Sequence, residues 1–512
     1  METSHQPDPV VFVIFGGGGD LTWRKLIPSL FNLHLHRSLP EQFAIVGVDR
    51  AAFTDATWRR RLRDGVRQFS NLGPIDAREW KAFAAHLSYQ RADFAAAKTY
   101  TDLAKRLEGL AKAWKAKPTH VFHLATPPSL VGVIPKHLAA AGLARDRERA
   151  RIVVEKPIGS DLASARRLNV TLTKSFHESQ IFRIDHYLGK ETVQNILAFR
   201  FANPMFEPIW NRRYVDYVTI TVAEEVGIGH RGKYFEGAGE LRDMVQNHVM
   251  QLLCLVAMEP PVSFNADEIR NKKVDVLHAL RPLPAEAVRA STVCGQYGRG
   301  TVQGKTVRGY RQEQDVAPDS HTETYAALKL FVDNWRWQDV PFYLRAGKRM
   351  PRQLTEIVVH FRRVPHRSFP PEAMPDWQPT RVVICIQPDE GIVLQFHAKQ
   401  PGGAMRLRLV DMRFSYRQAF AHPSPPAYAT LLRDVMINDA TLFMRNDQVE
   451  AAWAALMPVL DVWRETRPGD FPNYAAGSWG PEAADSRLMQ AGHKWVVSAG
   501  TGAKLPARRQ QR

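Results

Sequence analysis

Four chemically able side chains stand close together in one short stretch of the sequence, Gln180–Glu191. Asp185, His186, Tyr187 and Lys190 supply a carboxylate, an imidazole, a phenol and an ammonium group. The residues that lead up to Asp185 alternate between apolar and polar types, which predicts a half-buried strand. The residues after Lys190 carry apolar side chains at helical spacing. The four groups are therefore expected where a strand passes into a helix.

This junction has the chemistry of an anion site. If the helix starts early, His186 and Lys190 share one of its faces, because four residues separate them. Gly189 and Lys190 would then lie near the helix start, where backbone N–H groups and the helix dipole favour negative charge. The set suits a phosphorylated polyol. The alternative is a solvated strand-to-helix corner without a function.

The beginning of the chain predicts a nucleotide-binding loop. The apolar run Val10–Phe15 is typical of a buried parallel strand. Four glycines, Gly16–Gly19, follow it and precede Asp20, Leu21 and an amphipathic helix. Strand, glycine loop and helix in this order open a dinucleotide-binding domain, although Leu21 stands where the usual pattern has its third glycine.

Two further strand ends of this domain carry charged residues. The strand Phe43–Val48 ends at Asp49 and Arg50, at the place where such folds meet the adenosine ribose. The strand Arg151–Val154 precedes Glu155 and Lys156, and the following proline keeps Lys156 out of helical geometry. We therefore expect Lys156 at the edge of the sheet where ligands bind.

Composition limits the class of protein. The chain has 512 residues, 45% of them hydrophobic and 24% charged, and a formal charge of +17. The excess positive charge is scattered and no nucleic-acid-binding motif appears, so anionic small molecules are expected instead of nucleic acid. Three distant cysteines, the absence of a signal peptide at the N-terminus and the absence of a membrane-length apolar run together predict a cytoplasmic protein.

The pattern changes from Thr192 onward, and we expect a domain boundary near Leu188, with domains over 1–188 and 189–512. Tyr214–Val222 alternates as a strand and leads to Glu224, and a helix opening at Leu241 carries His248 on its apolar stripe. Most histidines so placed are ordinary core residues. Later strands are expected over 356–362, 381–387, 392–399 and 405–412, in one large sheet with antiparallel pairs, and a helix over 451–463. The basic tail, 500–512, is expected to be disordered.

Motifs along nearly the whole chain resemble the glucose-6-phosphate dehydrogenase family. The block Arg183–Glu191, which reads Arg-Ile-Asp-His-Tyr-Leu-Gly-Lys-Glu, is highly specific, whereas the glycine loop and Glu-Lys-Pro occur in other sugar dehydrogenases. The matching segments, in order, are Gly16–Leu26, Ala125–Pro128, Glu155–Pro157, Arg183–Glu191, Arg200–Asn203, Pro208–Asn211, Arg242–His248, Leu344–Lys348, Asp439–Phe443 and Ser478–Pro481.

The resemblance implies a fold and a reaction. It implies an α/β protein with an N-terminal Rossmann-like domain and a C-terminal α+β domain on a large, largely antiparallel sheet. The implied reaction oxidises β-D-glucose 6-phosphate at C1 to 6-phosphoglucono-lactone, with hydride transfer to NADP, at the entry to the pentose phosphate pathway. It implies a homodimer or homotetramer, with no metal, membrane or nucleic-acid partner.

The resemblance also implies roles for particular residues. His248, oriented by Asp185, is implied as the catalytic base. The expected cofactor contacts are Gly16, Gly19, Asp20, Leu21, Arg50 and Lys156. The expected substrate contacts are Lys156, His186, Tyr187, Lys190, Glu224, Asp243 and Lys348.

Cofactor choice and two alternative functions stay open at this point. Arg50 and the nearby Arg24 and Lys25 favour the 2′-phosphate of NADP, whereas Asp49 would accept hydrogen bonds from the ribose hydroxyls of NAD. We expect NADP to be preferred and NAD to be accepted. The alternatives are another NAD(P)-dependent sugar oxidoreductase that uses Lys156 as its main acid–base group, and a non-catalytic anion-binding homologue.

Overall fold

The computed structural model describes residues 8–70, 73–366, 368–374, 377–420, 424–466 and 469–498. The chain divides into two compact units. Unit 1 comprises Met1–Lys190, Pro261–Asn271 and Pro425–Trp453, and unit 2 comprises Glu191–Pro260, Lys272–Ser424 and Ala454–Arg512. The first long segment ends close to the expected boundary at Leu188, but two later segments return to unit 1. The expected disordered tail lies outside the described residues.

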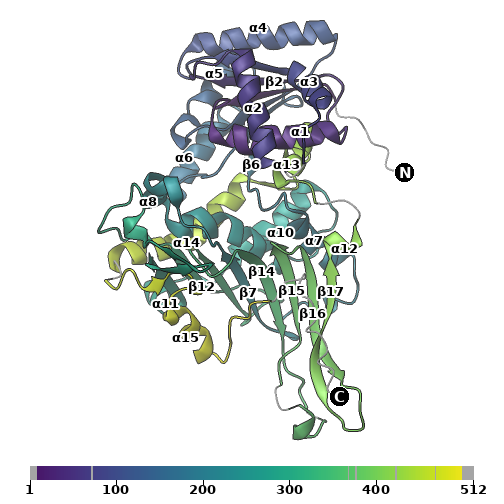
Figure 1. Ribbon diagram of the computed structural model, residues 1–512, viewed down its shortest axis with the longest axis vertical. Coiled ribbons are helices and arrows are strands. Elements are labelled where there is room, and N and C mark those ends of the chain that lie inside the picture. The colour runs from purple at the N-terminus through teal and green to yellow at the C-terminus, as the bar shows by residue number, and fades with distance from the viewer. Residues whose placement is uncertain are drawn as a thin grey trace. The chain divides into compact units, whose positions relative to one another are not determined.

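Seven of the described strands form the sheet of unit 1, in the order β18-β6-β5-β4-β1-β2-β3 (Figure 1). All neighbours are parallel except β18, which runs antiparallel to β6. The order reverses between β1 and β4, and ligands of such sheets bind at the carboxyl ends beside that reversal. The strands are β1 (Val10–Phe15), β2 (Phe43–Asp49), β3 (Leu87–Arg91), β4 (Thr119–Leu124), β5 (Ala150–Val154), β6 (Ile181–Ile184) and β18 (Phe443–Met444).

Helices connect these strands and cover the sheet, as parallel pairing requires. All six residues of β1 are buried, as its uninterrupted apolar sequence predicts. A late helix, α13, joins the same core through Leu431 and Val435, and the buried Arg151 donates to carbonyl groups at its C-terminal end. The described α-helices wholly inside unit 1 are α1 (Ile27–Leu35), α2 (Asp55–Phe69), α3 (Ala77–Ala85), α4 (Ala97–Trp114), α5 (Ile134–Ala140), α6 (Leu162–Thr173) and α13 (Ala427–Ile437).

Strand β6 is more deeply buried than its alternating sequence predicts. All four residues, Ile181–Ile184, are buried, including Arg183. Arg183 donates to both carboxylate oxygens of Glu178, at 2.6 and 3.1 Å. The expected half-buried strand was therefore wrong on this point, because a paired arginine can occupy a position that looks like a solvent-facing one.

Unit 2 contains a sheet of eight described strands in the order β17-β16-β15-β14-β7-β13-β12-β8 (Figure 1). Only the β7–β13 pair is parallel; the other neighbours are antiparallel. The large, mostly antiparallel sheet is thereby confirmed. Its strands are β7 (Val215–Ala223), β8 (Thr292–Gly295), β12 (Tyr325–Phe331), β13 (Pro341–Gly347), β14 (Leu354–Phe361), β15 (Arg381–Gln387), β16 (Gly391–Lys399) and β17 (Leu407–Ser415).

The helical segment of unit 2 that bears His248 differs from the expected regular helix. Residues Leu241–Val249 form a π-helix, η6, which continues into the α-helix Met250–Ala257, α9. Every residue of α9 is buried, in keeping with its apolar sequence. The other described helices wholly inside unit 2 include α7 (Glu191–Phe201), α8 (Gly232–Glu240), α11 (Ala285–Ser291) and α15 (Glu482–Gln490).

Three further expectations concern membrane-spanning helices, the cysteines and the last long helix. No helix in the described ranges is long and apolar enough to cross a membrane. All three cysteines lie within those ranges, and none of them forms a disulfide. The expected helix over 451–463 is confirmed as part of α14 (Asn446–Thr466), within which the division between the two units falls.

Candidate active site

The glycine loop of unit 1 packs its backbone closely against the backbone of the neighbouring strands. Gly16 has a φ of +88°, and a Cβ atom there would lie 2.1 Å from the carbonyl oxygen of Ala125, just after β4. A Cβ at Gly17 would lie 2.7 Å from the Cα of Gly47 in β2. Side chains are thus excluded at both positions. The loop therefore keeps the narrow, side-chain-free surface that lets a pyrophosphate approach the backbone.

Residues around the loop are tied together by charged groups. Asp49, at the end of β2, accepts hydrogen bonds from the N–H of Gly18 at 2.9 Å and from the N–H of Arg50 at 2.7 Å. Asp20 pairs with Arg24 at 3.4 Å. The Asp49 carboxylate, which the sequence offered as a ribose ligand, is thus used to hold the glycine loop, while Arg50 is exposed beside it.

Two further loop positions predicted as cofactor contacts, Gly19 and Leu21, are both partly buried. Gly19 donates its N–H to the carbonyl oxygen of Gly16 at 2.9 Å and closes the turn. Leu21 is partly buried and packs against the core of unit 1. Gly19 and Leu21 therefore shape the loop, and contact with a nucleotide from either would be through backbone.

The Glu-Lys-Pro segment follows β5 at the same edge of the sheet. Glu155 is held by two groups: His123 Nε2 lies 3.0 Å from one carboxylate oxygen, and the hydroxyl of Tyr428 donates to the other at 3.2 Å. Burial, together with the charge of Glu155, raises the pKa of Tyr428, so its proton stays on the phenol. Lys156 is half-buried next to this network, at the strand end where the sequence placed it.

The junction after β6 is a turn and not the start of a helix. Tyr187 donates its N–H to a carboxylate oxygen of Asp185 at 3.0 Å, and Lys190 donates its N–H to the carbonyl of Tyr187 at 3.1 Å. Helix α7 begins only at Glu191. The prediction that His186 and Lys190 share a helix face was wrong, because the Asp185 side chain satisfies the backbone in a turn instead.

The turn nevertheless brings together the side chains predicted to bind phosphate. Lys190 Nζ lies 4.2 Å from the centre of the Tyr187 ring. The His186 ring lies 5.2 Å from the ring of Tyr187 and stacks on Tyr428 with ring centres 6.4 Å apart. Since the N–H groups of Tyr187, Leu188 and Lys190 are already used within the turn, we expect an anion here to be bound mainly by side chains.

Unit 2 gathers a second polar cluster at the ends of β7 and β13. These strands are parallel neighbours, so Glu224 and Lys348, which follow them, emerge at the same end. Lys348 Nζ forms a very short ion pair with Glu224 and lies 3.6 Å from Asp243 of the π-helix. The three residues that the family resemblance assigned to sugar hydroxyls are thus in direct contact.

A fourth member of this cluster, Glu240, was not predicted. Its carboxylate is fully buried and lies 3.3 Å from Lys348 Nζ. Burial would lower the pKa of Lys348, but the charges of Glu240, Glu224 and Asp243 outweigh it and hold that pKa above its usual range. The sequence offered one weak signal, a carboxylate three residues before Asp243, but nothing showed that Lys348 lies beside both.

Glu240 is expected to make stability depend on pH. Burial, reinforced by Glu224 and Asp243 and opposed by Lys348, raises its pKa from 4.5 to about 8. The folded protein therefore retains a proton that the unfolded chain releases, so stabilisation is complete below pH 4.5 and is lost as the pH rises towards 8. Glu240→Gln keeps a neutral group at every pH. The melting temperature of this variant, relative to that of wild type, should therefore increase as the pH rises from about 5 to about 9. A constant difference across that range would contradict the assignment.

His248 is fully buried in the π-helix, one residue after Asn247, whose side-chain oxygen accepts the His248 N–H at 2.6 Å. The helix begins after a break at Gly239, where φ is +67° and a Cβ would lie 2.3 Å from a carboxylate oxygen of Glu323. Glu323 in turn accepts the N–H of Leu241 at 3.2 Å. Because π-bulges concentrate at functional sites, this geometry adds support to His248 as a reacting group.

The predicted site residues therefore fall into two groups. Unit 1 holds the cofactor residues together with Asp185, His186, Tyr187 and Lys190, whereas unit 2 holds Glu224, Asp243, His248 and Lys348. Each group is assembled within its own unit. The pairing of Asp185 with His248 joins one residue from each unit and remains a proposal.

The glycine loop and the strand order β3-β2-β1-β4-β5-β6 define unit 1 as the nucleotide-binding half of a dinucleotide-dependent protein. Comparison with known families then specifies the protein further. Residues 13–195 match the glucose-6-phosphate dehydrogenase NAD-binding domain, and residues 197–496 match the glucose-6-phosphate dehydrogenase C-terminal domain. The chain belongs to the glucose-6-phosphate dehydrogenase family.

Individual members of the family are similar to this chain over nearly its full length. The chain is 45% identical over 489 residues to a glucose-6-phosphate 1-dehydrogenase of Aggregatibacter actinomycetemcomitans, covering 95% of this chain and 97% of that one. It is similar to a solved glucose-6-phosphate dehydrogenase in complex with its substrate glucose 6-phosphate, with a TM-score of 0.86, 33% identity, and 97% and 100% coverage. A Mycobacterium avium enzyme gives a TM-score of 0.82 at 36% identity, covering 96% of this chain and 99% of that chain. The family resemblance seen in the motifs is confirmed.

Proposed function

We propose that this protein is a glucose-6-phosphate 1-dehydrogenase. It oxidises β-D-glucose 6-phosphate at C1 to 6-phospho-D-glucono-1,5-lactone, with NADP as hydride acceptor, in the first step of the pentose phosphate pathway. The observation that carries the proposal is membership of the family over residues 13–195 and 197–496. NADP, when bound, supplies the nicotinamide carbon that accepts the hydride.

The residues of unit 1 fit a dinucleotide. A Cβ atom at Gly16 or Gly17 would clash with neighbouring backbone. The N–H of Gly18 donates a hydrogen bond to Asp49, which fixes the conformation of the loop. Arg50 is exposed at the end of β2, where a guanidinium can bind a ribose phosphate in a bidentate manner. Gly16, Gly19, Asp20 and Leu21 would border the phosphates, and Lys156 would lie near both the nicotinamide and the sugar.

The residues of the turn after β6 would bind the substrate phosphate. Lys190 supplies a full positive charge, and His186 and Tyr187 supply hydrogen-bond donors beside it. Such charge-assisted bonds are the stronger class of hydrogen bond. The phosphate would hold the sugar by the end that is remote from C1.

The cluster of unit 2 would orient the sugar hydroxyl groups. Glu224 and Asp243 can accept hydrogen bonds, and Lys348 can donate them once a hydroxyl replaces one of its present partners. His248 would take the O1 proton as hydride leaves C1, because the carbonyl forms only if that proton is removed. Asp185 would orient the imidazole and stabilise its charged form.

Cofactor selectivity gives a first test of the nucleotide site. Arg50→Ala should weaken NADP far more than NAD, because only NADP carries the 2′-phosphate. Asp49→Ala should weaken both cofactors, because Asp49 accepts the N–H of Gly18 and so holds the glycine loop. Steady-state kcat/KM with each cofactor measures both effects. An unchanged NADP-to-NAD ratio in Arg50→Ala would show that the ribose pocket lies elsewhere.

The two alternative functions are separated by substrate. Another sugar oxidoreductase with a Glu-Lys-Pro strand end would turn over free glucose about as well as glucose 6-phosphate, and a non-catalytic homologue would turn over neither. The proposed enzyme strongly prefers the phosphorylated sugar. Absorbance of NADPH, recorded with both sugars and both cofactors, distinguishes the three.

Further proposals concern the cell and the assembly. Three cysteines without a disulfide are typical of a reducing compartment, which supports a cytoplasmic location. We also propose that residues 189–512, apart from the two segments that return to unit 1, form the substrate and oligomerisation domain of a homodimer or homotetramer, as the family resemblance implies. Sedimentation of the full chain would measure the assembly directly.

A further inference from the structure

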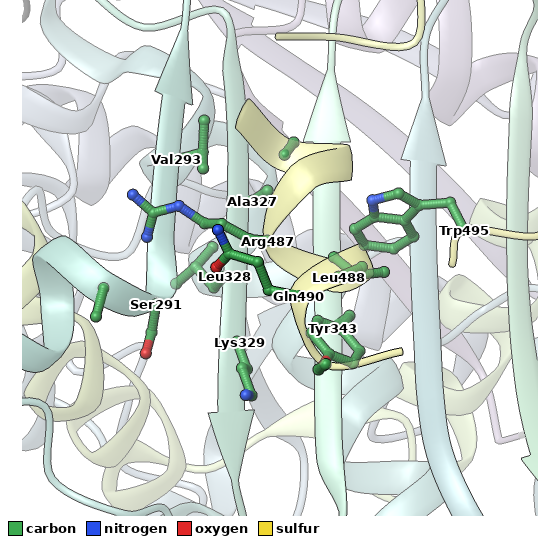
Figure 2. Close-up of a pocket in the computed structure, with 13 residues that line it drawn as sticks. Ser291, Val293, Ala327, Leu328, Lys329, Tyr343, Arg487, Leu488, Gln490 and Trp495 are labelled. Carbon is green, nitrogen blue, oxygen red and sulfur yellow. The ribbon is translucent and has the colours of Figure 1, made fainter. Parts of the chain in front are cut away.

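A cleft in unit 2 lies outside the proposed active site. It encloses about 260 Å³ beside α15, over strands β8, β12 and β13. Its floor is made of alanine, valine and leucine side chains, and its polar residues are Ser291, Lys329, Arg487 and Gln490 (Figure 2). Among the described residues that line it none is acidic, although two are cationic.

Arg487 lacks an anionic partner in this cleft. Its Nη1 atom is buried and has no hydrogen-bond partner among the described residues. Burial lowers the pKa of Arg487, and the group that opposes this effect is Cys294. Burial raises the pKa of that thiol to about 12, so it is neutral and supplies no charge. A buried N–H group without an acceptor is costly, and a bound anion would relieve that cost at Nη1.

The second cation of the cleft, Lys329, lies near two aromatic rings. Its Nζ lies 5.3 Å from the centre of the Phe331 ring and 5.9 Å from that of Tyr343. It extends from β12 on the same side of the sheet as Arg487 (Figure 2). The cleft is therefore lined by two positive groups, one from α15 and one from β12.

Trp495 closes the other side of the cleft and is fixed in place. Its ring packs on the Arg345 guanidinium at 4.2 Å and edge-on against Tyr343, with ring centres 6.2 Å apart. Its buried Nε1 atom has no hydrogen-bond partner in the described part of the chain. Figure 2 shows Arg487 and Trp495 on opposite sides of α15. The cleft thus offers charge at one end and an aromatic wall at the other.

We propose that this cleft binds a small organic anion in which a planar apolar group carries a carboxylate or a phosphate. The anionic group would pair with Arg487 and Lys329, and the planar group would lie on the apolar floor towards Trp495. The volume is just below the range of drug-sized ligand sites, roughly 300–1,000 Å³, which sets the ligand at about one ring.

Titration calorimetry on the full chain tests this with benzoate, phenyl phosphate and the neutral benzamide. Saturating glucose 6-phosphate is present to fill the proposed substrate phosphate site. One of the two anions should bind with a dissociation constant of roughly 1 mM, as expected for so few atoms. Benzamide should bind about 10-fold more weakly, because it lacks the charge. The stronger of the two anions identifies the headgroup as carboxylate or phosphate.

Variants of residues in and beside the cleft test whether the anion binds there. Arg487→Gln and Lys329→Gln should each weaken the anion by roughly 10-fold. Arg289→Gln removes an exposed arginine from α11, which borders the same cleft, and should leave binding unchanged. Equal affinity in Arg487→Gln and Arg289→Gln, equal affinity for benzamide and the anions, or no binding of either anion would overturn the proposal. If Arg487→Gln does not fold, Lys329→Gln decides.

Discussion

Replacing His248 by Asn should lower kcat by roughly 10²–10⁴ while glucose 6-phosphate still binds. The side chain is fully buried in the π-helix, and asparagine keeps its polar character without a basic nitrogen. Without a base, the O1 proton must leave to water as hydride leaves C1. Steady-state turnover and substrate binding by calorimetry, measured on the same preparation, separate the chemical step from binding.

A matched control removes another buried imidazole. His360 lies on β14, is 1% exposed and stacks on Tyr217 with ring centres 3.9 Å apart. His360→Asn should change stability but leave the turnover of the folded enzyme near that of wild type. Asp185→Asn should lower kcat as well, because the imidazole loses its orienting carboxylate. Near-normal turnover in His248→Asn would remove this residue from the mechanism.

Lys190→Ala should cost roughly 1.5–3 kcal/mol of glucose 6-phosphate binding, the contribution of a hydrogen bond to a charged group. This corresponds to a loss of about 10- to 150-fold in affinity. Lys190 precedes α7 and lies over the Tyr187 ring, so its removal deletes a charge without opening the core. Binding of the sugar phosphate and KM are the quantities to measure.

Free glucose provides the internal control for this prediction, because it has no phosphate to lose. Its weak turnover should be little affected by Lys190→Ala. Lys174→Ala removes an exposed lysine just after α6 and should leave both substrates unchanged. Equal losses on the two sugars in Lys190→Ala would mean that Lys190 supports the structure and does not bind phosphate.

The sequence predicted the nucleotide-binding half well because its signals are local. The apolar run Val10–Phe15 and the glycines after it define strand and loop directly, and Pro157 places Lys156 at a strand end. The large sheet of unit 2 was also predictable from alternating strands. Its order was not, since β7 and β13 pair across more than one hundred intervening residues.

Other features of the site depend on contacts that no local pattern encodes. The turn after Asp185 replaces an early helix because one carboxylate satisfies its backbone. Tyr428 reaches Glu155 and His186 from a late segment that returns to unit 1. Glu240 was not predicted as a site residue, and only the approach of Lys348, which follows β13, gives it a role. These three features depend on which residues lie close together in the folded chain, and residue type alone does not predict them.

The most direct test of the proposed reaction uses glucose 6-phosphate that carries deuterium at C1. With NADP as acceptor, the deuterium should appear in the reduced cofactor, and turnover under conditions where chemistry limits the rate should slow relative to unlabelled substrate. Mass spectrometry of the cofactor measures the transfer. Reduced cofactor without deuterium, or deuterium retained in the sugar product, would contradict oxidation at C1.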